Sequence, residues 1–395
     1  MSSICLYMHV HQPRRLRNFS VFDIGKEENY FADDENKRYL DRIASKSYLP
    51  VNKILKDLIK ETDGQFKVSL SISGSVLDQL EKFSPETLQS FKDLVATGNV
   101  DLLAETYYHS LSFLYSKEEF KKQVQLHKNK LKKFFGIRPR VFRNTELMFN
   151  NEIAKTAEEM GYKGVLAEGA DHILEWRSPN FVYNAKTASK IGVLLRNYRL
   201  SDDIAFRFSN KDWKEWPLTT EKFAQWVNQV NGNGQIVNLF MDYETFGEHQ
   251  WHETGILEFL KRFPHELLKH PDNDFVTTTE AVKKYKPTAE LDVHSTISWA
   301  DIERDLTAWT GNKMQEKALE YVYSLEKKIL ESKNKKLIED WRRLQTSDHF
   351  YYMCTKWFSD GDVHAYFNPY ESPYEAFITY MNIFNDLKFR LEEAK

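Results

Sequence analysis

The sequence predicts an α/β fold in which a parallel sheet closes, or nearly closes, into a barrel and a helical region follows it. Strand-like and helix-like stretches alternate over about the first 285 residues, and this alternation is typical of parallel strands joined by helices. Beyond about residue 290, helical periodicity continues without strand-like partners. We therefore expect two domains, a β/α barrel over residues 1–289 and a helical bundle over residues 290–395.

Seven stretches of the first part have the composition of strands. Each is short, rich in β-branched or aromatic residues, and followed by turn residues or a helical pattern. They are ICLYMHVH (4–11), FKVSLSIS (66–73), VDLLAETYYH (100–109), RVFRNTELMF (140–149), KGVLAEG (163–169), GVLLRN (192–197) and QIVNLFMD (235–242). Seven strands with helices between most of them favour a closed or nearly closed barrel over an open sheet.

One helix between these strands, over residues 116–136, has both ends marked in the sequence. Ser116 and Glu119 form the pattern of a capping box, in which each side chain accepts from a backbone N–H at the start of the helix. Gly136 follows the last apolar position, where a left-handed residue ends many helices. The sequence therefore predicts where this helix begins and ends.

Three stretches of the second part have helical periodicity. They are ADIERDLTAWTGNKMQEKALEYVYSLEKKILES (300–332), KLIEDWRRLQTSDHFYYMCTKWF (336–358) and SPYEAFITYMNIFNDLKFRLEEAK (372–395). No repeat, low-complexity tract or flexible linker separates them from the first part. The two parts are therefore expected to dock rigidly.

Composition excludes several classes of protein. The 58 acidic and 55 basic side chains give a net charge of −3, which argues against a nucleic-acid partner. Cys5 and Cys354 are isolated from each other, so neither a disulfide framework nor zinc spacing is expected and a reducing compartment is favoured. No secretory leader is recognised at the N-terminus, and no apolar run approaches the ~18–20 residues of a membrane span. A soluble, cytoplasmic globular protein is expected.

Polar side chains gather at the predicted strand ends. In β/α barrels the working residues lie at the C-terminal ends of the strands. Here they are His9 and His11 after the first strand, Glu105 and His109 in the third, Glu146 in the fourth, and Asp242 and Glu244 at the seventh. Each alone has an ordinary explanation, such as a satisfied histidine, a helix cap or an ion pair. Their convergence predicts a functional site.

The residues at these strand ends suit two kinds of chemistry. Glu146 and Asp242 come from different strands, and hydrolysis of a glycosidic bond needs two carboxyl groups facing each other across a cleft. The spacing of His9 and His11, with carboxylates nearby, is also compatible with a zinc or manganese site for metal-dependent hydrolysis. A serine or thiol nucleophile is disfavoured, because Cys5 lies within a strand and no G-x-S-x-G pattern occurs.

Five short motifs run in order along the chain. They are HVHQP (9–13), GNVDLLAETYYHS (98–110), FRNTEL (142–147), MDYETFGEH (241–249) and LQTSDHFYYM (344–353). In this order they resemble the five regions of glycoside hydrolase family 57, and within it the α-amylase-like group. The stretch ISWADIERDLTAWTGN (297–312) is also similar to amylase-type members.

This resemblance implies an incomplete seven-stranded β/α barrel followed by a helical domain that completes the active-site cleft. It implies cleavage of α-glucans with retention of configuration, with Glu146 as nucleophile, Asp242 as acid/base, and no metal or cofactor. The residues expected to contact substrate are His9, His11, Glu105, His109, Glu244, Trp299, Asp301 and Asp348. For Glu244 we expect a hydrogen bond to substrate or a like-charge effect that raises the pKa of Asp242. The family's W-L-x-E-R pattern is here RNTEL (143–147), which puts the sub-specificity in doubt rather than the catalysis.

Several activities remain open at the level of sequence. The leading hypothesis is a retaining hydrolase of α-1,4 bonds in starch, glycogen or maltodextrin. A 4-α-glucanotransferase or branching enzyme would use the same two carboxylates. A metal-dependent carbohydrate deacetylase or zinc α-mannosidase-like enzyme would use His9 and His11, and a glucan-binding homologue would have only vestigial activity. The expected partner is an α-glucan, with neither a nucleic acid nor a membrane.

Overall fold

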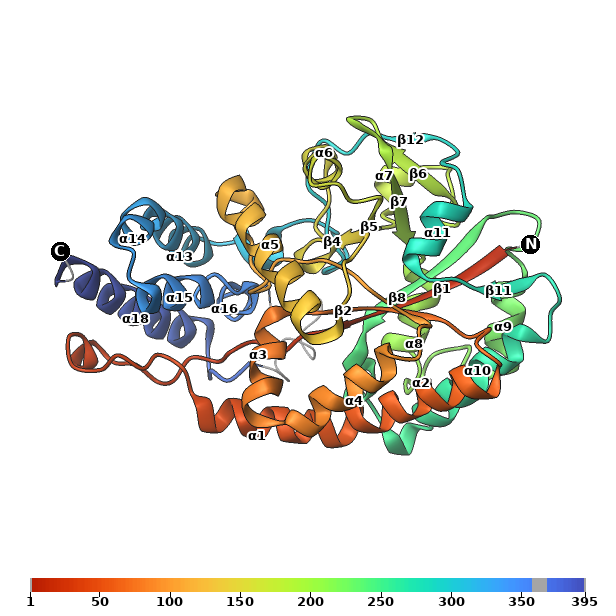
Figure 1. Cartoon of the computed structure of the whole chain (residues 1–395), viewed down its shortest axis with the longest axis horizontal. Coiled ribbons are helices and arrows are strands. Elements are labelled where there is room, and N and C mark those ends of the chain that lie inside the picture. Colours follow the sequence, from red (N-terminus) through yellow and green to blue (C-terminus); the bar gives the residue numbers. More distant parts are fainter. Residues whose placement is uncertain (1, 357–367, 394–395) are drawn as a thin grey trace.

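The protein has an α/β fold of two five-stranded sheets, most of whose strand pairs are parallel, with helices packed around them (Figure 1). The computed structural model describes residues 2–356 and 368–393. Two of the predicted helical stretches end at residues 358 and 395, so Trp357, Phe358, Ala394 and Lys395 lie outside the described residues. Among the residues described, no helix combines the length and apolar character that crossing a membrane requires.

The first sheet is built around β1. This strand pairs in parallel with β8 along its length, with β2 at its C-terminal end and with β11 at its N-terminal end, while β2 pairs with β3. The strands are β1 (Ser2–Val10), β2 (Val68–Ile72), β3 (Val100–Leu102), β8 (Ile236–Asp242) and β11 (Asn273–Phe275). The register of β1 and β8 places His9 opposite Asp242.

The second sheet has the order β12-β6-β7-β5-β4, and β6–β7 is its one antiparallel pair. Its strands are β4 (Val141–Arg143), β5 (Gly164–Glu168), β6 (Val182–Ala185), β7 (Ala188–Arg196) and β12 (Glu290–Leu291). A parallel bridge between Ala104 and Phe142 links the two sheets on one side. On the other side the Asn197 N–H donates to the Asn238 carbonyl at 2.9 Å, which brings the end of β7 beside β8.

All seven predicted stretches contain a strand, but two of the strands are much shorter than expected. β3 ends at Leu102 and β4 at Arg143. Beyond them the chain enters the left-handed region at His109, with φ 51°, and at Glu146, with φ 55°. That backbone conformation cannot continue a strand. The departure from the prediction therefore falls on the segments that carry the candidate site residues.

Helices cover both sheets and form the end of the molecule that lies at the left in Figure 1. Around the sheets lie α1 (Asp33–Ile43), η2 (Ala44–Tyr48), α2 (Leu49–Glu61), α3 (Gly74–Phe83), α4 (Pro85–Val95), α5 (Lys117–Phe135), α6 (Asn151–Glu159), α7 (Asp171–Leu174), α8 (Tyr198–Ala205), α9 (Thr220–Asn228), α10 (Ile256–Leu268) and α11 (Thr278–Lys284). The helical part contains α12 (Thr307–Thr310), α13 (Lys313–Ser324), α14 (Glu326–Ser332), α15 (Lys335–Arg343), α16 (Ser347–Tyr351) and α18 (Pro373–Glu393).

The start of α5 shows how the helical part is attached. Ser116 is the N-cap and accepts from the Glu119 N–H at 3.1 Å, and Gly136 ends the helix with φ 72°, so both predicted ends are confirmed. The reciprocal half of the capping box was wrong. The Glu119 carboxylate binds the Arg342 guanidinium of α15 at 2.8 and 3.0 Å, because a buried charged partner competes successfully with a backbone N–H.

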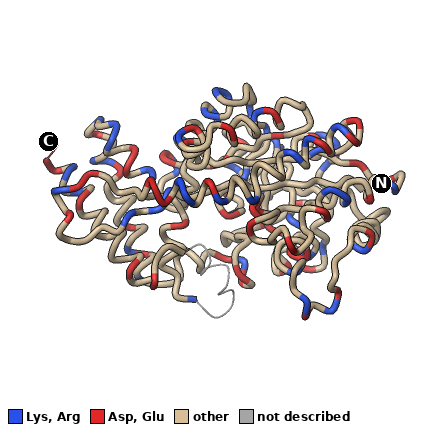
Figure 2. The backbone as a smooth tube through the Cα atoms, turned by 90° about the horizontal axis from the view of Figure 1, so that it is seen from below, with Lys and Arg blue, Asp and Glu red and all other residues tan. Residues whose placement is uncertain are grey.

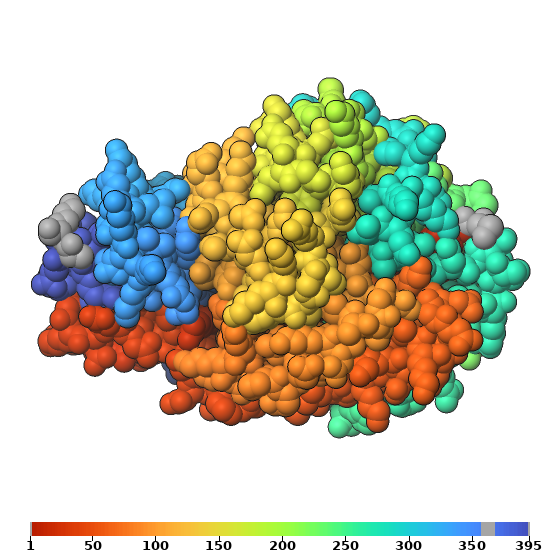
Figure 3. Space-filling model, viewed as in Figure 1, coloured from red at the N-terminus to blue at the C-terminus, as the bar shows by residue number. Residues whose placement is uncertain are grey.

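The N-terminal segment that follows β1 also joins the helical part. It runs along α18, as the neighbouring red and blue regions of Figures 1 and 3 show. The Tyr30 hydroxyl donates to the Asp386 carboxylate at 2.6 Å, and the Asn382 amide donates to the Phe19 carbonyl at 3.0 Å. Acidic and basic residues are interspersed along the described backbone in Figure 2.

Candidate active site

The ends of β1 and β8 place the first members of the site beside each other. His9 lies near the end of β1 and His11 just beyond it, and their rings stack with centroids 5.7 Å apart. His9 is the register partner of Asp242, and its Nδ1 lies 3.6 Å from Asp242 Oδ1. Its Nε2 lies 3.2 Å from Glu105 Oε2. One buried imidazole therefore bridges carboxylates from two different strand ends.

His109 makes the next bridge. Its Nε2 lies 2.8 Å from Glu146 Oε1, and its Nδ1 lies 3.5 Å from Glu105 Oε2. His109 and Glu146 both have left-handed backbones, which cost about 1–3 kcal/mol per residue and persist only where the surroundings enforce them. Thr145 supplies such a constraint, because its hydroxyl donates to the Ser110 carbonyl at 2.7 Å. The described contacts thus run from Asp242 through His9, Glu105 and His109 to Glu146.

The helical part contributes Asp348 and Ser347 at the start of α16. Asp348 Oδ2 lies 3.1 Å from His11 Nε2, and the Ser347 hydroxyl lies 3.4 Å from Glu146 Oε1. The Ser347 N–H donates to the His109 carbonyl at 2.9 Å, which ties α16 to the strand-end segments. The predicted helix over 336–358 is interrupted at this point, between α15 and α16, and Thr346 is the N-cap of the new helix. The interruption lets α16 reach the site.

Trp299 also contacts Glu146, from the loop before α12. Its indole N–H donates to Glu146 Oε2 at 2.8 Å, and its backbone N–H donates to the Glu146 carbonyl at 3.2 Å. Asp301 lies two residues further along the same loop, half-buried and with φ 55°, and makes none of the contacts described above. The structure therefore brings together Glu146, Asp242 and seven of the eight residues that were expected to contact substrate. The seventh is Glu244, beside Asp242, and the eighth is Asp301.

Electrostatics keep Glu146 and Asp242 ionised. Burial raises the pKa of Glu146, but the hydrogen bond and charge of His109 and the charge of Arg143 outweigh burial and hold it below the usual value. Burial also opposes the charge on His109, yet the carboxylates of Glu105 and Glu146 raise its pKa to about 9. For Asp242, the hydrogen bond from His9 and the charge of His249 outweigh burial and lower the pKa.

Glu244 behaves differently from the expectation that it would raise the pKa of Asp242. Burial and the charge of Asp242 raise the pKa of Glu244 itself to about 8. Its carboxyl group is enclosed, with the Tyr48 hydroxyl and the Gln12 amide as hydrogen-bond partners. Asp242 instead has His9 beside it and a side chain that is 41% exposed. The like-charge effect therefore places the proton on Glu244, the more deeply buried carboxyl group.

Two groups of side chains among the described residues have metal-ligand spacing. They are His9, Glu105 and His109, and His11, His109 and Asp348, whose ligand atoms lie within 4.8 Å of one another. Both need a lone pair from His109. Its two nitrogens face Glu105 and Glu146, and its raised pKa favours the imidazolium, which has no lone pair to donate. The residues present fit an ion-paired histidine better than a metal ligand.

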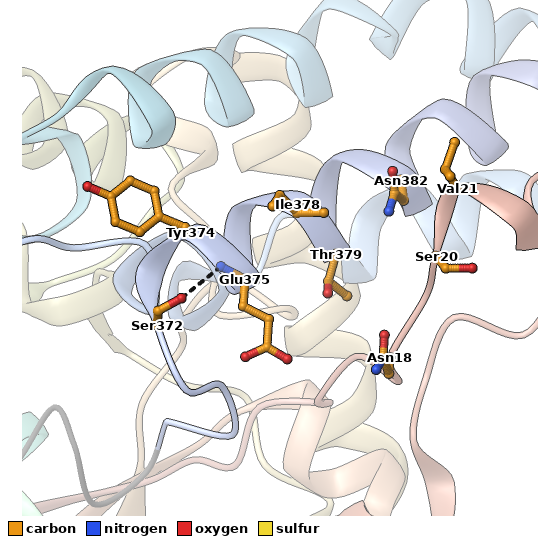
Figure 4. Close-up of a pocket in the computed structure, with 9 residues that line it drawn as sticks. All are labelled: Asn18, Ser20, Val21, Ser372, Tyr374, Glu375, Ile378, Thr379 and Asn382. Carbon is orange, nitrogen blue, oxygen red and sulfur yellow. Dashed lines mark hydrogen bonds between the residues drawn. The ribbon is translucent and has the colours of Figure 1, made fainter.

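Sequence reasoning missed Tyr48 and Ser347. Tyr48 ends η2, a short π-helix that is far in sequence from any strand end, and no flanking residue marks it as a site residue. Ser347 could have been found, because it precedes Asp348 directly in the fifth motif. A surface pocket of ≈ 530 Å³ between residues 18–21 and 372–382 (Figure 4) contains none of the predicted site residues.

His109 should make the stability of the protein pH-dependent. Its folded pKa of about 9 lies above the ordinary value of 6.5, so its contribution is complete below pH 6.5 and is lost as the pH rises through 9. We expect the difference in free energy of unfolding between the wild type and His109→Gln, from urea titrations, to shrink between pH 6.5 and 9. The exposed His172, changed to Gln, is the matched control. A difference independent of pH would contradict the assigned charge on His109.

Comparison with known proteins gives a consistent family. A model of glycosyl hydrolase family 57 matches residues 5–294. A Methanocaldococcus jannaschii protein named "Putative alpha-amylase" is 44% identical over 403 residues, covering 99% of this chain and 85% of the relative. The fold of this chain is similar to that of a family 57 branching enzyme from Pyrococcus horikoshii, with a TM-score of 0.67 and 17% sequence identity. The match covers 89% of this chain and 85% of the branching enzyme. This chain is also similar to a 4-alpha-glucanotransferase from Thermococcus litoralis (TM-score 0.65, 16% identity, 88% of this chain), although it spans just over half, 56%, of that protein.

Proposed function

The chain belongs to glycosyl hydrolase family 57 and is therefore a glycoside hydrolase. From this premise we propose that it cleaves α-1,4-glucosidic bonds of starch, glycogen or maltodextrin with retention of configuration. The observation that carries the proposal is the series of contacts linking Asp242, His9, Glu105, His109 and Glu146. It joins the carboxyl groups of Glu146, in the turn after β4, and of Asp242, at the end of β8. Double displacement needs two such groups on opposite sides of the scissile bond. The name of the 44% identical relative supports the α-amylase type of activity.

In this mechanism Glu146 is the nucleophile. A nucleophilic carboxylate has to be ionised and held in one orientation. His109 and Arg143 keep the pKa of Glu146 low, and hydrogen bonds from His109 and Trp299 engage its two oxygens. Attack on the anomeric carbon forms a glycosyl-enzyme intermediate, and the aglycone oxygen leaves with a proton.

Asp242 supplies that proton and later deprotonates the incoming water. Its side chain is half-exposed, so a bound glucan would cover it and raise its pKa, because burial disfavours the charged form. Glu244, protonated at neutral pH by virtue of its raised pKa of about 8, adds no second negative charge beside Asp242. Water attack on the intermediate then releases the sugar with its original configuration.

The finer architecture belongs to the same proposal. An inner core of side chains from both sheets, including Cys5, Leu166, Leu194 and Phe240, supports an incomplete barrel built on the seven strands predicted within residues 1–289. The two sheets also contain β6, β11 and β12, and β12 lies just beyond residue 289. Asp348 and Ser347 support a role for residues 290–395, proposed as a helical bundle, in completing the cleft. The free, buried state of Cys5 and Cys354 is compatible with the expected cytoplasmic location.

Products from maltoheptaose test the function. A hydrolase gives only shorter maltooligosaccharides, whereas a 4-α-glucanotransferase also gives longer ones, because a second sugar replaces water at the same intermediate. A branching enzyme would add α-1,6 linkages to amylose. The fold of the branching enzyme and the glucanotransferase makes these the second candidates. Absence of any turnover of α-glucans would contradict the proposal as a whole.

Asp348 tests whether the helical part takes part in binding substrate. Losing a buried hydrogen-bonding group typically costs about 1–3 kcal/mol, so Asp348→Ala should lower kcat/KM by about ten- to a hundredfold. Thermal stability should fall only by the loss of the contact with His11, since Thr346 rather than Asp348 is the N-cap of α16. Asp340, on the far side of the helix break and bound to Lys336 and Arg390, is the control for a purely structural carboxylate. An Asp348→Ala enzyme with full kcat/KM would remove this residue from the site.

A further inference from the structure

Four charged side chains that the proposed reaction does not use lie beside the site. We call Glu168, Arg196, Asp202 and Arg304 the charge cluster. Glu168 ends β5, Arg196 ends β7, Asp202 belongs to α8, and Arg304 comes from the loop between Trp299 and α12. Their side chains are only 0%, 4%, 11% and 17% exposed, respectively. Buried charges on this scale require an explanation, because removing them from water is costly.

The cluster is balanced, with two guanidinium groups and two carboxylates. Arg196 binds Glu168 at 3.1 Å and Asp202 at 2.5 Å, and its Nε donates to the Phe240 carbonyl of β8 at 2.8 Å. Arg304 lies 3.5 Å from Glu168 and 3.4 Å from Asp202. Buried ion pairs add little net stability compared with apolar packing. A role in fixing geometry accounts for them better than a role in stability.

Arg304 extends the cluster into the loop that carries Trp299. Its guanidinium donates to the Trp299 carbonyl, and its own carbonyl accepts from the Ser298 N–H at 3.1 Å. The Ser298 hydroxyl donates to the Asp305 carbonyl at 2.6 Å and closes the same loop. The loop turns through left-handed residues at Asp301 and Arg304, with φ 55° and 54°. Through Glu168, Arg304 joins this compact loop to a strand end of the second sheet.

Trp299 in turn joins the charge cluster to Glu146. Its ring lies 5.1 Å from the Arg143 guanidinium and 5.9 Å from that of Arg196. Its indole N–H donates to Glu146 Oε2. Because the backbone N–H of Trp299 also binds the Glu146 carbonyl, a shift of this loop moves both contacts at once. The orientation of the Glu146 carboxylate therefore depends on where the loop is held.

We propose that Arg304 is a positioning residue, which Glu168 and Asp202 hold in place and which fixes Trp299 so that the indole orients the Glu146 carboxylate. The proposal rests on the proposed function of Glu146 as nucleophile. The planar guanidinium suits this role because it binds two carboxylates and a carbonyl in one rigid geometry, which an ammonium group cannot do. Displacement of a reacting group by about 1 Å can cost about a hundredfold in rate.

The test compares Arg304→Gln with Trp299→Phe on maltoheptaose. We expect Arg304→Gln to lower kcat by about ten- to a hundredfold with little change in KM, and Arg304→Lys to recover part of the loss. The double variant should be no slower than the slower single variant, because both changes act through one contact. Hydrogen exchange of the amides of residues 298–305, measured by mass spectrometry, should be faster in Arg304→Gln than in the wild type.

Arg177→Gln is the matched control. Arg177 also donates from its guanidinium to backbone carbonyls, those of Ile173, Leu174 and Glu290, and is outside the charge cluster. We expect its kcat to equal that of the wild type. Wild-type kcat in Arg304→Gln, or independent losses that multiply in the double variant, would overturn the proposal. If Glu146→Gln stays active, the nucleophile assignment fails, and the exchange rates still report whether Arg304 holds the loop.

Discussion

Glu146→Gln should lower kcat on maltoheptaose by at least about a thousandfold and leave substrate binding nearly intact. The amide has almost the same shape as the carboxylate but cannot form the covalent intermediate. The structural change should be small, because the amide oxygen can still accept from His109 and Ser347, which face Oε1, and only the contact from the Trp299 indole to Oε2 is lost. The measurement is kcat from product formation, with binding followed by calorimetry on the inactive variant.

Glu152→Gln is the control for this prediction. Glu152 lies in α6, is exposed, and pairs with Lys117 at 2.9 Å at the surface, away from the site. Its kcat should equal that of the wild type. More than a tenth of the wild-type kcat in Glu146→Gln would remove Glu146 as nucleophile, and a collapse of binding would show that its role is to hold the substrate.

The part of the site that comes from strand ends could be predicted from sequence. His9 and Asp242 each follow an apolar strand, and the parallel order of β1 and β8 makes them register partners. This inference needs only the side-chain alternation of strands and the position of active sites in such folds. The same reasoning overestimated the length of β3 and β4. Nothing in the local sequence shows that His109 and Glu146, further along the same stretches, adopt left-handed backbones. Glycine or asparagine would have been the usual signal.

The parts that come from loops and from the helical region could not be derived in this way. Trp299 and Asp348 were expected only through the resemblance to family 57 motifs. Tyr48 and Arg196 lie in none of the quoted motifs, and nothing in the stretch 297–312 singles out Arg304. Each has a partner distant in sequence, as the contacts of Tyr48 with Glu244 and of Arg304 with Glu168 illustrate. The pKa values of Asp242 and Glu244 likewise depend on residues that are distant in sequence. Which of Asp242 and Glu244 keeps a proton depends on the burial of each and on His9, so spacing alone placed the effect on the wrong carboxyl group.

Asp242→Ala should separate the two chemical steps of the proposed reaction. On maltoheptaose, loss of the general acid should lower kcat by about a hundred- to ten-thousandfold. A maltooligoside with a good leaving group, such as a nitrophenol, does not need that acid, so the intermediate on Glu146 should form and then accumulate, because no base activates water. The burst of nitrophenol, equal to the enzyme concentration, is the measurement. Asp272→Ala, an exposed aspartate near β11, is the control.

Azide distinguishes the assigned role of Asp242 from the alternatives. As a small anion it attacks the intermediate without needing a general base, so it should raise the turnover of the nitrophenyl substrate by Asp242→Ala and leave the wild type unchanged. Two successive displacements at the anomeric carbon give the α-glycosyl azide, the configuration of the starting glycoside. A β-glycosyl azide would mean a single displacement, as in inverting enzymes, whose carboxyl groups lie about 6.5–9.5 Å apart rather than the 5–5.5 Å expected between Glu146 and Asp242. Absence of any azide effect, with normal binding of substrate, would assign the acid/base role to another residue. The neighbouring Glu244, with its raised pKa of about 8, would then be the first residue to test by substitution.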